Sequence, residues 1–269
     1  GLTKRRGDFA LQGLDLTLPA GCIMGLIGEN GAGKSTTIRL ILNALSRDGG
    51  TVAVYGKDNR ALTPLEREDI GAVLDEVGLP EYMTAAQIGR MMAGIFTRWQ
   101  PEVYRDYLRR LALPEDKPFR DFSRGMKMKL GLAAALSHQP KLLLLDEATS
   151  GLDPVVRDEI LTIFADFTRD EEHAVLISSH IVSDLEKICD YIAFLHKGRL
   201  LLCEEKDRLT EAYGILRGGA EDIDPAAVCG RHTTPYGTEY LVRRDAVPVG
   251  MALGQVNIED LFVFMAKEV

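Results

Sequence analysis

The chain has 269 residues, 46% of them hydrophobic, which suits one large α/β domain with a small appendage. Its formal net charge of −8 argues against broad, sequence-independent binding to nucleic acid. The four cysteines are scattered without metal-ligand spacing, and no apolar run approaches about 18 residues, so we expect small buried thiols in a reducing cytosol and no membrane-spanning segment in this sequence.

The first third of the chain predicts short strands around one glycine-rich loop. Residues 9–18 partly alternate apolar and polar side chains, as a half-buried antiparallel strand does. Residues 22–27 are apolar, as expected of a buried strand, and a helix is predicted from residue 34 to about residue 46. Two further strands are predicted at residues 51–55 and 70–74.

The rest of the chain first turns helical and then alternates strands with helices. We expect helices at residues 85–99, 103–113, 124–136, 155–168, 181–188 and 258–266, and strands at residues 141–146, 174–178, 191–196, 199–203 and 238–243. The alternation from residue 141 onwards predicts a mostly parallel sheet flanked by helices, which is an α/β fold. Ser123 and Asn257 are the expected N-caps of two of these helices.

A phosphate-binding loop stands between the predicted strand at 22–27 and its helix. A glycine, four residues and then Gly-Lys-Ser is the spacing of such a loop. Glycines allow the backbone to turn its N–H groups toward a triphosphate, Lys34 supplies charge for the β- and γ-phosphates, and the Ser35 hydroxyl can bind Mg²⁺. A chance glycine-rich turn is the alternative, and the strand–loop–helix context argues against it. The predicted nucleotide-binding residues here are Gly28, Glu29, Asn30, Gly31, Ala32, Gly33, Lys34, Ser35 and Thr36.

Two adjacent carboxylates, Asp146 and Glu147, follow a run of leucines at residues 142–145. A strand that is apolar on both faces places the acids at its carboxyl end, where open α/β sheets bind ligands. Asp146 can orient Mg²⁺, and Glu147 can polarise water for attack on a γ-phosphate. The alternative is a pair of solvated acids at a strand end.

Five motifs now resemble those of ATP-binding cassette (ABC) subunits, the ATP-hydrolysing motors of ABC transporters. Besides the 28–36 loop they are residues 123–125, 142–147, 150–153 and 178–180, in the family's order and spacing. The resemblance covers about residues 3–205. It implies a P-loop fold of ABC ATPase type, a mostly parallel sheet with an antiparallel β subdomain and a helical subdomain at about residues 75–121. The expected ATPase domain is residues 1–213, followed by a small C-terminal extension at 214–269.

The resemblance also implies a mechanism. Two subunits, identical or different, would dimerise head-to-tail around two Mg²⁺-ATP, each site taking Ser123 and Gly125 from the second subunit. Asp146 would orient the metal, Glu147 would act as general base, and His180 would sense the γ-phosphate. Taken alone, His180 is more typical of a helix cap or a core histidine. A separate transmembrane permease, most simply of an exporter, would hold the chain on the cytoplasmic face of the membrane, with no nucleic acid as partner.

Four positions depart from the family's commonest pattern. The Leu-Ser-Gly-Gly-Gln signature is here Phe-Ser-Arg-Gly-Met at residues 122–126, a form similar to that of drug- and peptide-exporting or immunity-type subunits. Asp75 replaces a glutamine that usually touches Mg²⁺; a carboxylate is also a hard oxygen ligand, so Asp75 is a predicted metal ligand, with solvent or the permease as the alternative. Arg6 stands where an aromatic usually stacks on adenine, while the alternation around Phe9 favours the core. Gly151 replaces a common alanine.

Two other classes of protein are alternatives to the transporter subunit. A soluble ABC ATPase acting on DNA, ribosomes or cluster assembly is the main alternative, and the chain lacks the long heptad repeats or second cassette that such proteins carry. An ordinary P-loop kinase or GTPase is disfavoured because the Ser123 and His180 motifs are present and a guanine-reading Asn-Lys-x-Asp is not.

Overall fold

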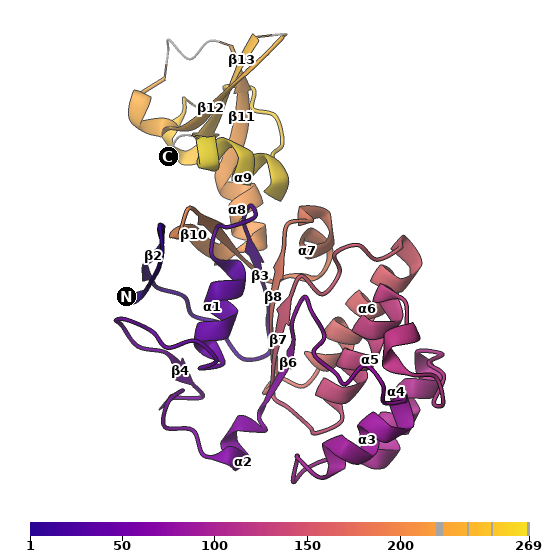
Figure 1. Cartoon of the computed structure of the whole chain (residues 1–269). Coiled ribbons are helices and arrows are strands. Elements are labelled where there is room, and N and C mark those ends of the chain that lie inside the picture. The colour runs from indigo at the N-terminus through magenta and orange to yellow at the C-terminus, as the bar shows by residue number, and fades with distance from the viewer. Residues whose placement is uncertain (219–222, 236, 249, 268–269) are drawn as a thin grey trace.

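The computed structural model describes residues 1–218, 223–235, 237–248 and 250–267. Its centre is a mostly parallel sheet (Figure 1). The strands run in the order β10 (Arg199–Glu205), β9 (Tyr191–His196), β3 (Ile23–Ile27), β8 (Ala174–Ser179), β7 (Leu142–Asp146) and β6 (Ile70–Val73). Neighbours from β9 to β6 pair in parallel, and β10 joins β9 antiparallel. This sheet confirms the α/β architecture expected from the alternating pattern.

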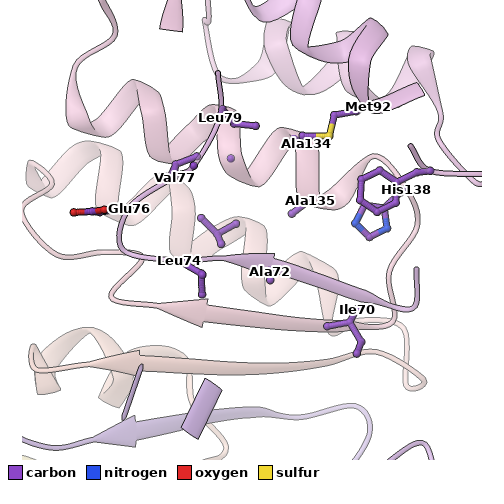
Figure 2. Close-up of a pocket in the computed structure, with 14 residues that line it drawn as sticks. Ile70, Ala72, Leu74, Glu76, Val77, Leu79, Met92, Ala134, Ala135 and His138 are labelled. Atoms are coloured by element: carbon purple, nitrogen blue, oxygen red, sulfur yellow. The ribbon is translucent and has the colours of Figure 1, made fainter. Parts of the chain in front are cut away.

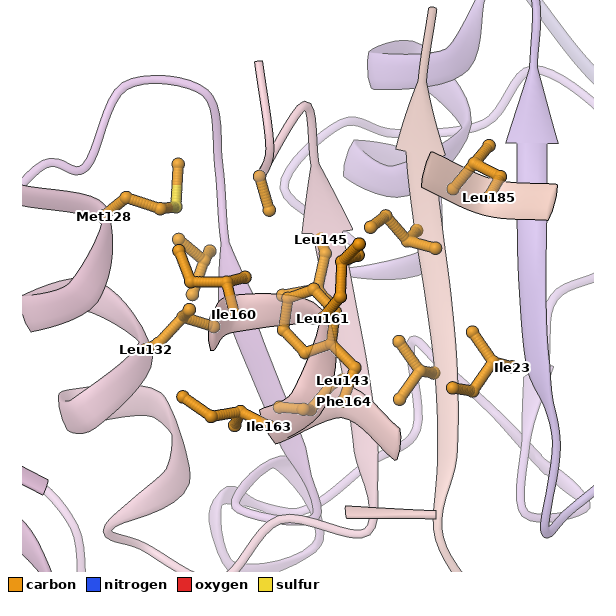
Figure 3. Close-up of a cluster of buried hydrophobic side chains, with 14 of the residues drawn as sticks. Ile23, Met128, Leu132, Leu143, Leu145, Ile160, Leu161, Ile163, Phe164 and Leu185 are labelled. Carbon is orange, nitrogen blue, oxygen red and sulfur yellow. The ribbon is translucent and has the colours of Figure 1, made fainter. Parts of the chain in front are cut away.

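Helices cover both faces of the sheet, as the apolar strands require. Every residue of β3, β7 and β8 is buried. In β7, Leu143 and Leu145 join the apolar cluster drawn in Figure 3, whereas Leu142 and Leu144 join a second cluster on the opposite face. The first cluster includes side chains of α5 (Arg124–Leu136), α6 (Pro154–Phe167) and α7 (Val182–Ile188), and the second includes α1 (Lys34–Ile41). Since the leucines of β7 are buried on both faces, the strand lies inside the sheet. The polar residues at its end therefore lie at the carboxyl edge of the sheet.

Smaller elements flank the sheet on two sides (Figure 1). On the side of the sheet that α1 covers lie several short elements (Figure 1). They are the antiparallel strands β1 (Leu2–Arg6) and β2 (Phe9–Leu14), the hairpin of β4 (Ala53–Val54) and β5 (Lys57–Asp58), and the helix α2 (Pro64–Arg67). Helices α3 (Ala85–Ala93) and α4 (Pro101–Arg110) and the 3-10 turn η1 (Phe119–Asp121) lie beside α5. The hydroxyl of Tyr104 on α4 donates to the carbonyl of Ala85 on α3 at 2.9 Å, which ties these two helices together.

The C-terminal segment builds its own antiparallel sheet in the order β11–β13–β12. Its elements are α8 (Lys206–Ala212), β11 (Tyr213–Arg217), η3 (Pro225–Ala227), β12 (Val228–Thr234), β13 (Gly237–Arg243), η4 (Arg244–Ala246) and α9 (Ile258–Lys267). Helix α9 returns to the main sheet, where the rings of Phe262 and Phe194 meet edge-on at 5.3 Å. The backbone N–H of Ile258 also donates to Glu186 of α7 at 3.2 Å. The apolar core of the main sheet therefore continues into the C-terminal segment.

Several expected elements are shorter in the structure. The helix from residue 34 ends at Ile41, because Asn43 adopts a left-handed conformation at φ 55°. The helix expected at 85–99 ends at Ala93 before Gly94, and the strand expected at 51–55 contracts to β4. Strands β1, β11 and β12 were not anticipated. All four cysteines are free. The expected burial is right only for Cys189, because Cys22, Cys203 and Cys229 are partly exposed. Within the described ranges, no helix has both the length and the apolar character that crossing a bilayer demands.

Candidate functional site

Three polar segments meet at the carboxyl ends of adjacent strands. The phosphate-binding loop follows β3, the two carboxylates end β7, and His180 follows β8. In the register of the sheet, Asp146 pairs with Ser178, and Ile27 pairs with Ser179. The sheet therefore brings together residues that lie more than a hundred positions apart in the sequence, at the edge where α/β sheets bind ligands.

The loop between β3 and α1 has the tight backbone that its glycines predict. A Cβ at Gly28 would collide with the carbonyl of Leu195, so this position accepts only glycine. Gly33 adopts φ +114°, and a Cβ there would lie 2.9 Å from the ring of Phe9. Phe9 is thus half-buried against the loop itself, in partial agreement with the expectation that it belongs to the core. Arg6 is exposed.

Lys34 is the first residue of α1, and its side chain, only 5% exposed, reaches back to the loop. Its Nζ donates to the carbonyls of Gly28 at 2.7 Å and Glu29 at 3.3 Å. It also forms an ion pair with Oε1 of Glu147 at 3.2 Å. A buried ammonium needs such partners, and a triphosphate would offer it stronger ones.

Asp146 accepts hydrogen bonds from two serine hydroxyl groups beside the loop. Its Oδ1 accepts from Ser35 Oγ at 3.0 Å and from Ser178 Oγ at 2.7 Å, and the residue is 1% exposed. A carboxylate beside a serine hydroxyl is an all-oxygen donor set, which suits Mg²⁺ completed by phosphate and water oxygens. Ser35 and Asp146 therefore fit a magnesium ion bound with a triphosphate.

Glu147 joins the loop to His180. Its Oε2 lies 2.7 Å from Nδ1 of His180, while Oε1 faces Lys34. Glu147 is a non-glycine residue at φ 53°, a conformation that costs about 1–2 kcal/mol. Its N–H is held by the carbonyl and the hydroxyl of Ser178, both at 3.1 Å. Such strain, where the surroundings enforce it, aims the carboxylate into the site.

The remaining loop residues differ in their surroundings. Asn30 and Gly31 are exposed, Ala32 is buried beneath Gly28, and Thr36 is partly buried. Glu29 points toward His196, whose Nδ1 lies 2.9 Å from Oε1 of Glu29. Partial burial raises the pKa of Glu29, but hydrogen bonds from its own backbone and from His196 outweigh burial, so the pKa falls below its usual value.

The structure does not bring Ser123 and Gly125 into this cluster within one chain. They lie at the start of α5, which packs on the face of the sheet opposite α1. The hydroxyl of Ser123 caps α5 by accepting from the N–H of Met126 at 3.3 Å, and Gly125 packs near Val156 of α6. Asp75, the predicted metal ligand, forms an ion pair with Arg124 at 2.9 Å.

Sequence reasoning missed the role of Ser178. This buried serine connects Asp146 to the backbone of Glu147, so it orders both carboxylates. It belongs to the Ser-Ser-His stretch at 178–180, which was singled out only for its histidine. A hydroxyl that directly follows an aliphatic strand, in register with an expected metal ligand, was the available signal.

The site combines a phosphate-binding loop, a buried Lys34–Glu147 ion pair, and a hydroxyl–carboxylate pair of Ser35 and Asp146 that suits Mg²⁺. These features at one edge of a parallel sheet define a P-loop nucleoside triphosphatase. Comparisons with known proteins narrow this class. The family model described as "ABC transporter" matches residues 11–150. The bacitracin transport ATP-binding protein BcrA of Enterococcus faecalis is 28% identical over 96% of this chain and 86% of its own length. The lantibiotic transport ATP-binding protein SrtF of Streptococcus pyogenes is 32% identical over 73% of this chain and 85% of its own length.

A solved structure described as the ATP binding subunit of an ABC transporter superposes with a TM-score of 0.71 at 26% identity, over 78% of this chain and 90% of that one. The chain belongs to the ABC transporter family. It is an ATP-binding subunit with ATPase activity, which confirms the resemblance, the fold class and the kind of enzyme expected from the sequence.

Proposed function

We propose that two such subunits associate head-to-tail around two Mg²⁺-ATP, so that Ser123 and Gly125 of one subunit complete the site of the other. The observation that carries this proposal is the separation of Ser123 and Gly125 from the other predicted site residues within one chain. Lys34, Asp146, Glu147 and His180 converge at one place, whereas the N-terminus of α5 lies elsewhere. Backbone N–H groups at a helix N-terminus favour anions, so the Ser123 segment suits a γ-phosphate presented by a partner.

Within each site, the chain's own residues divide the work. The amides of the 28–36 loop and the ammonium of Lys34 bind the β- and γ-phosphates. The carboxylate of Glu147 accepts a proton from the attacking water, and its strained backbone keeps it aimed at that position. The imidazole of His180, which lies 2.7 Å from Oε2 of Glu147, donates toward the γ-phosphate.

Ser35 and Asp146 would hold Mg²⁺, since a hydroxyl and a buried carboxylate already meet there at 3.0 Å. When bound, Mg²⁺ supplies positive charge to the phosphate oxygens. Ser178 keeps Asp146 in place by its hydrogen bond. Asp75 stays a predicted third ligand, and the metal dependence of ATP binding in Asp75→Gln tests that role.

A transmembrane permease would dock at an apolar groove beside the helical subdomain (Figure 2). The groove measures about 380 Å³ and runs between strand β6, at the edge of the sheet, and α5. Its wall includes Val77, Leu79 and Met92, and at one end the rings of His138 and Phe96 stack at 4.1 Å. Burial lowers the pKa of His138, which keeps this end uncharged near neutral pH. Such a groove suits the apolar face of a short permease helix.

We further propose that the transporter is an exporter and that the chain works on the cytoplasmic face of the membrane, held there by the permease. Support comes from the relatives named for bacitracin and lantibiotic transport and from the Ser-Arg-Gly-Met signature. The experiment that tests the partnership is purification of the full chain from membranes, followed by identification of a multispan protein that copurifies. Val77→Glu should abolish copurification, while Tyr55→Glu, on the hairpin outside the groove, should not. A nucleic-acid or ribosomal complex in place of a multispan protein would favour the soluble ABC ATPase.

A further inference from the structure

Three positions at which the sequence departs from the commonest family pattern meet at one point of the structure. Asp75 follows β6, Arg124 opens α5, and Gly151 lies in the loop between β7 and α6. Nη2 of Arg124 donates to Oδ1 of Asp75 at 2.9 Å. A Cβ placed on Gly151 would lie 3.1 to 3.4 Å from three atoms of the Arg124 guanidinium group. The departures are therefore one packed unit and not separate substitutions.

Arg124 needs a partner because of its place in the helix. The first turn of α5, residues 124–127, carries two cations and no acid. The N-terminus of a helix bears partial positive charge, so a cation there is unfavourable, and an acid in the first turn normally offsets it. Asp75 supplies that negative charge from another segment of the chain. The acid that the helix lacks in its sequence is thus provided by the fold.

Gly151 makes room for the pair. Its φ of +68° is a conformation that side chains rarely adopt, and the guanidinium of Arg124 lies along its open side. An alanine here would be strained and would press on Arg124. Gly151 also lies two residues before Asp153, which caps α6 by accepting from Val155 and Val156. The pair therefore links the loop after β6, the start of α5 and the loop before α6.

We propose that Asp75 and Gly151 position Arg124, and that this ion pair sets the orientation of the Ser123–Met126 turn for nucleotide-driven association of two subunits. Asp75, Arg124 and Gly151 are positioning residues. The inference rests on the proposed head-to-tail dimer, in which that turn faces the partner's nucleotide. Both side chains are about half exposed, 54% for Arg124 and 53% for Asp75, so the pair adjusts geometry and is not a major source of stability.

The test uses the full chain carrying Glu147→Gln to prevent turnover, with Arg124→Gln, Asp75→Asn and both together. The dimer fraction is measured by sedimentation velocity during an Mg²⁺-ATP titration, and binding of a fluorescent ATP analogue is measured at protein concentrations too low for dimers. We expect each single variant to weaken dimerisation about two- to fivefold, and the double variant to be no worse than either. Analogue binding by Arg124→Gln should change less than twofold, because Arg124 is not one of the predicted residues of the chain's own phosphate site.

The matched control is the ion pair between Arg110 of α4 and Asp166 of α6, at 3.1 Å and with similar exposure of 48% and 33%. Arg110→Gln should leave dimerisation unchanged. A Gly151→Ala variant should behave as Arg124→Gln does. Unchanged or stronger dimerisation in Arg124→Gln, or additive losses in the double variant, would overturn the proposal.

A second measurement does not depend on dimers. The N–H groups of Met126 and Lys127 donate to the hydroxyl and the carbonyl of Ser123. Their hydrogen exchange should accelerate to the same extent in Asp75→Asn and Arg124→Gln, and remain unchanged in Arg110→Gln. If the parent chain fails to dimerise with Mg²⁺-ATP, the proposed dimer is wrong, while the exchange rates still decide whether Asp75 orders this turn through Arg124. Equal exchange in all variants contradicts the positioning role.

Discussion

Replacing Glu147 by glutamine should separate ATP binding from ATP hydrolysis. The amide keeps the shape of the side chain but accepts no proton from the attacking water. Loss of a general base lowers turnover by about a hundred- to ten-thousandfold. Lys34 should stay in position, because Gly28 and Glu29 still accept its hydrogen bonds at 2.7 and 3.3 Å.

The structure also predicts the direction in which the affinity for ATP changes in Glu147→Gln. Oε1 of Glu147 lies 3.2 Å from Nζ of Lys34, and a triphosphate must compete with this ion pair. Glutamine removes the carboxylate charge but can still hydrogen-bond to the charged ammonium. The cost of displacement therefore falls by about 1 kcal/mol, within the range of about 1.5–3 kcal/mol for hydrogen bonds to charged groups. That difference corresponds to about fivefold tighter binding.

Two assays check these effects in one preparation. Phosphate release measures turnover, and a fluorescent ATP analogue measures affinity. Hydrolysis at the wild-type rate would mean that Glu147 is not the base. Weaker nucleotide binding in Glu147→Gln would refute the competition between its carboxylate and the phosphates for Lys34.

Three further predictions concern other parts of the molecule. Lys34→Ala should weaken binding of the fluorescent ATP analogue at least tenfold, since it removes a buried cation facing the phosphates; unchanged affinity would exclude this loop as the triphosphate site. Asp75→Gln should raise ATP affinity in EDTA more than in Mg²⁺ if Asp75 reaches the metal, and equal shifts would exclude that role. Phe164→Ala should lower the free energy of unfolding by about 3–5 kcal/mol in urea titrations, whereas the exposed Val155→Ala should change it by less than about 0.5 kcal/mol.

The sequence predicted the elements whose patterns are local and strong. The leucines at 142–145 and the apolar run before the phosphate loop became β7 and β3, because a strand buried on both faces needs a continuous apolar run. Ser123 caps α5 as expected, since a serine hydroxyl satisfies the first free N–H groups of a helix. Chemistry at strand ends was predictable because parallel strands deliver their carboxyl ends to one edge.

What the sequence left out depends on contacts between distant segments. The role of Ser178 follows from its register against Asp146, 32 positions away, and the partner of Asp75 lies 49 positions away in Arg124. Strand β12 has few apolar residues of its own, and α9 packs against it. The binding of Mg²⁺ by Asp75 stays a prediction.

The composite site is the central claim, and mixing two defective subunits tests it most directly. Lys34→Ala disables a phosphate loop, and Gly125→Asp places a negative charge at the start of α5, where the structure leaves ordinary space for a Cβ, 3.6 Å from Val156. Each variant alone should be inactive. Mixed in equal amounts, they should recover about a quarter of the wild-type ATPase rate, because about half of the dimers are mixed and each holds one intact site of two. A mixture as inactive as its components would contradict a site shared between two subunits.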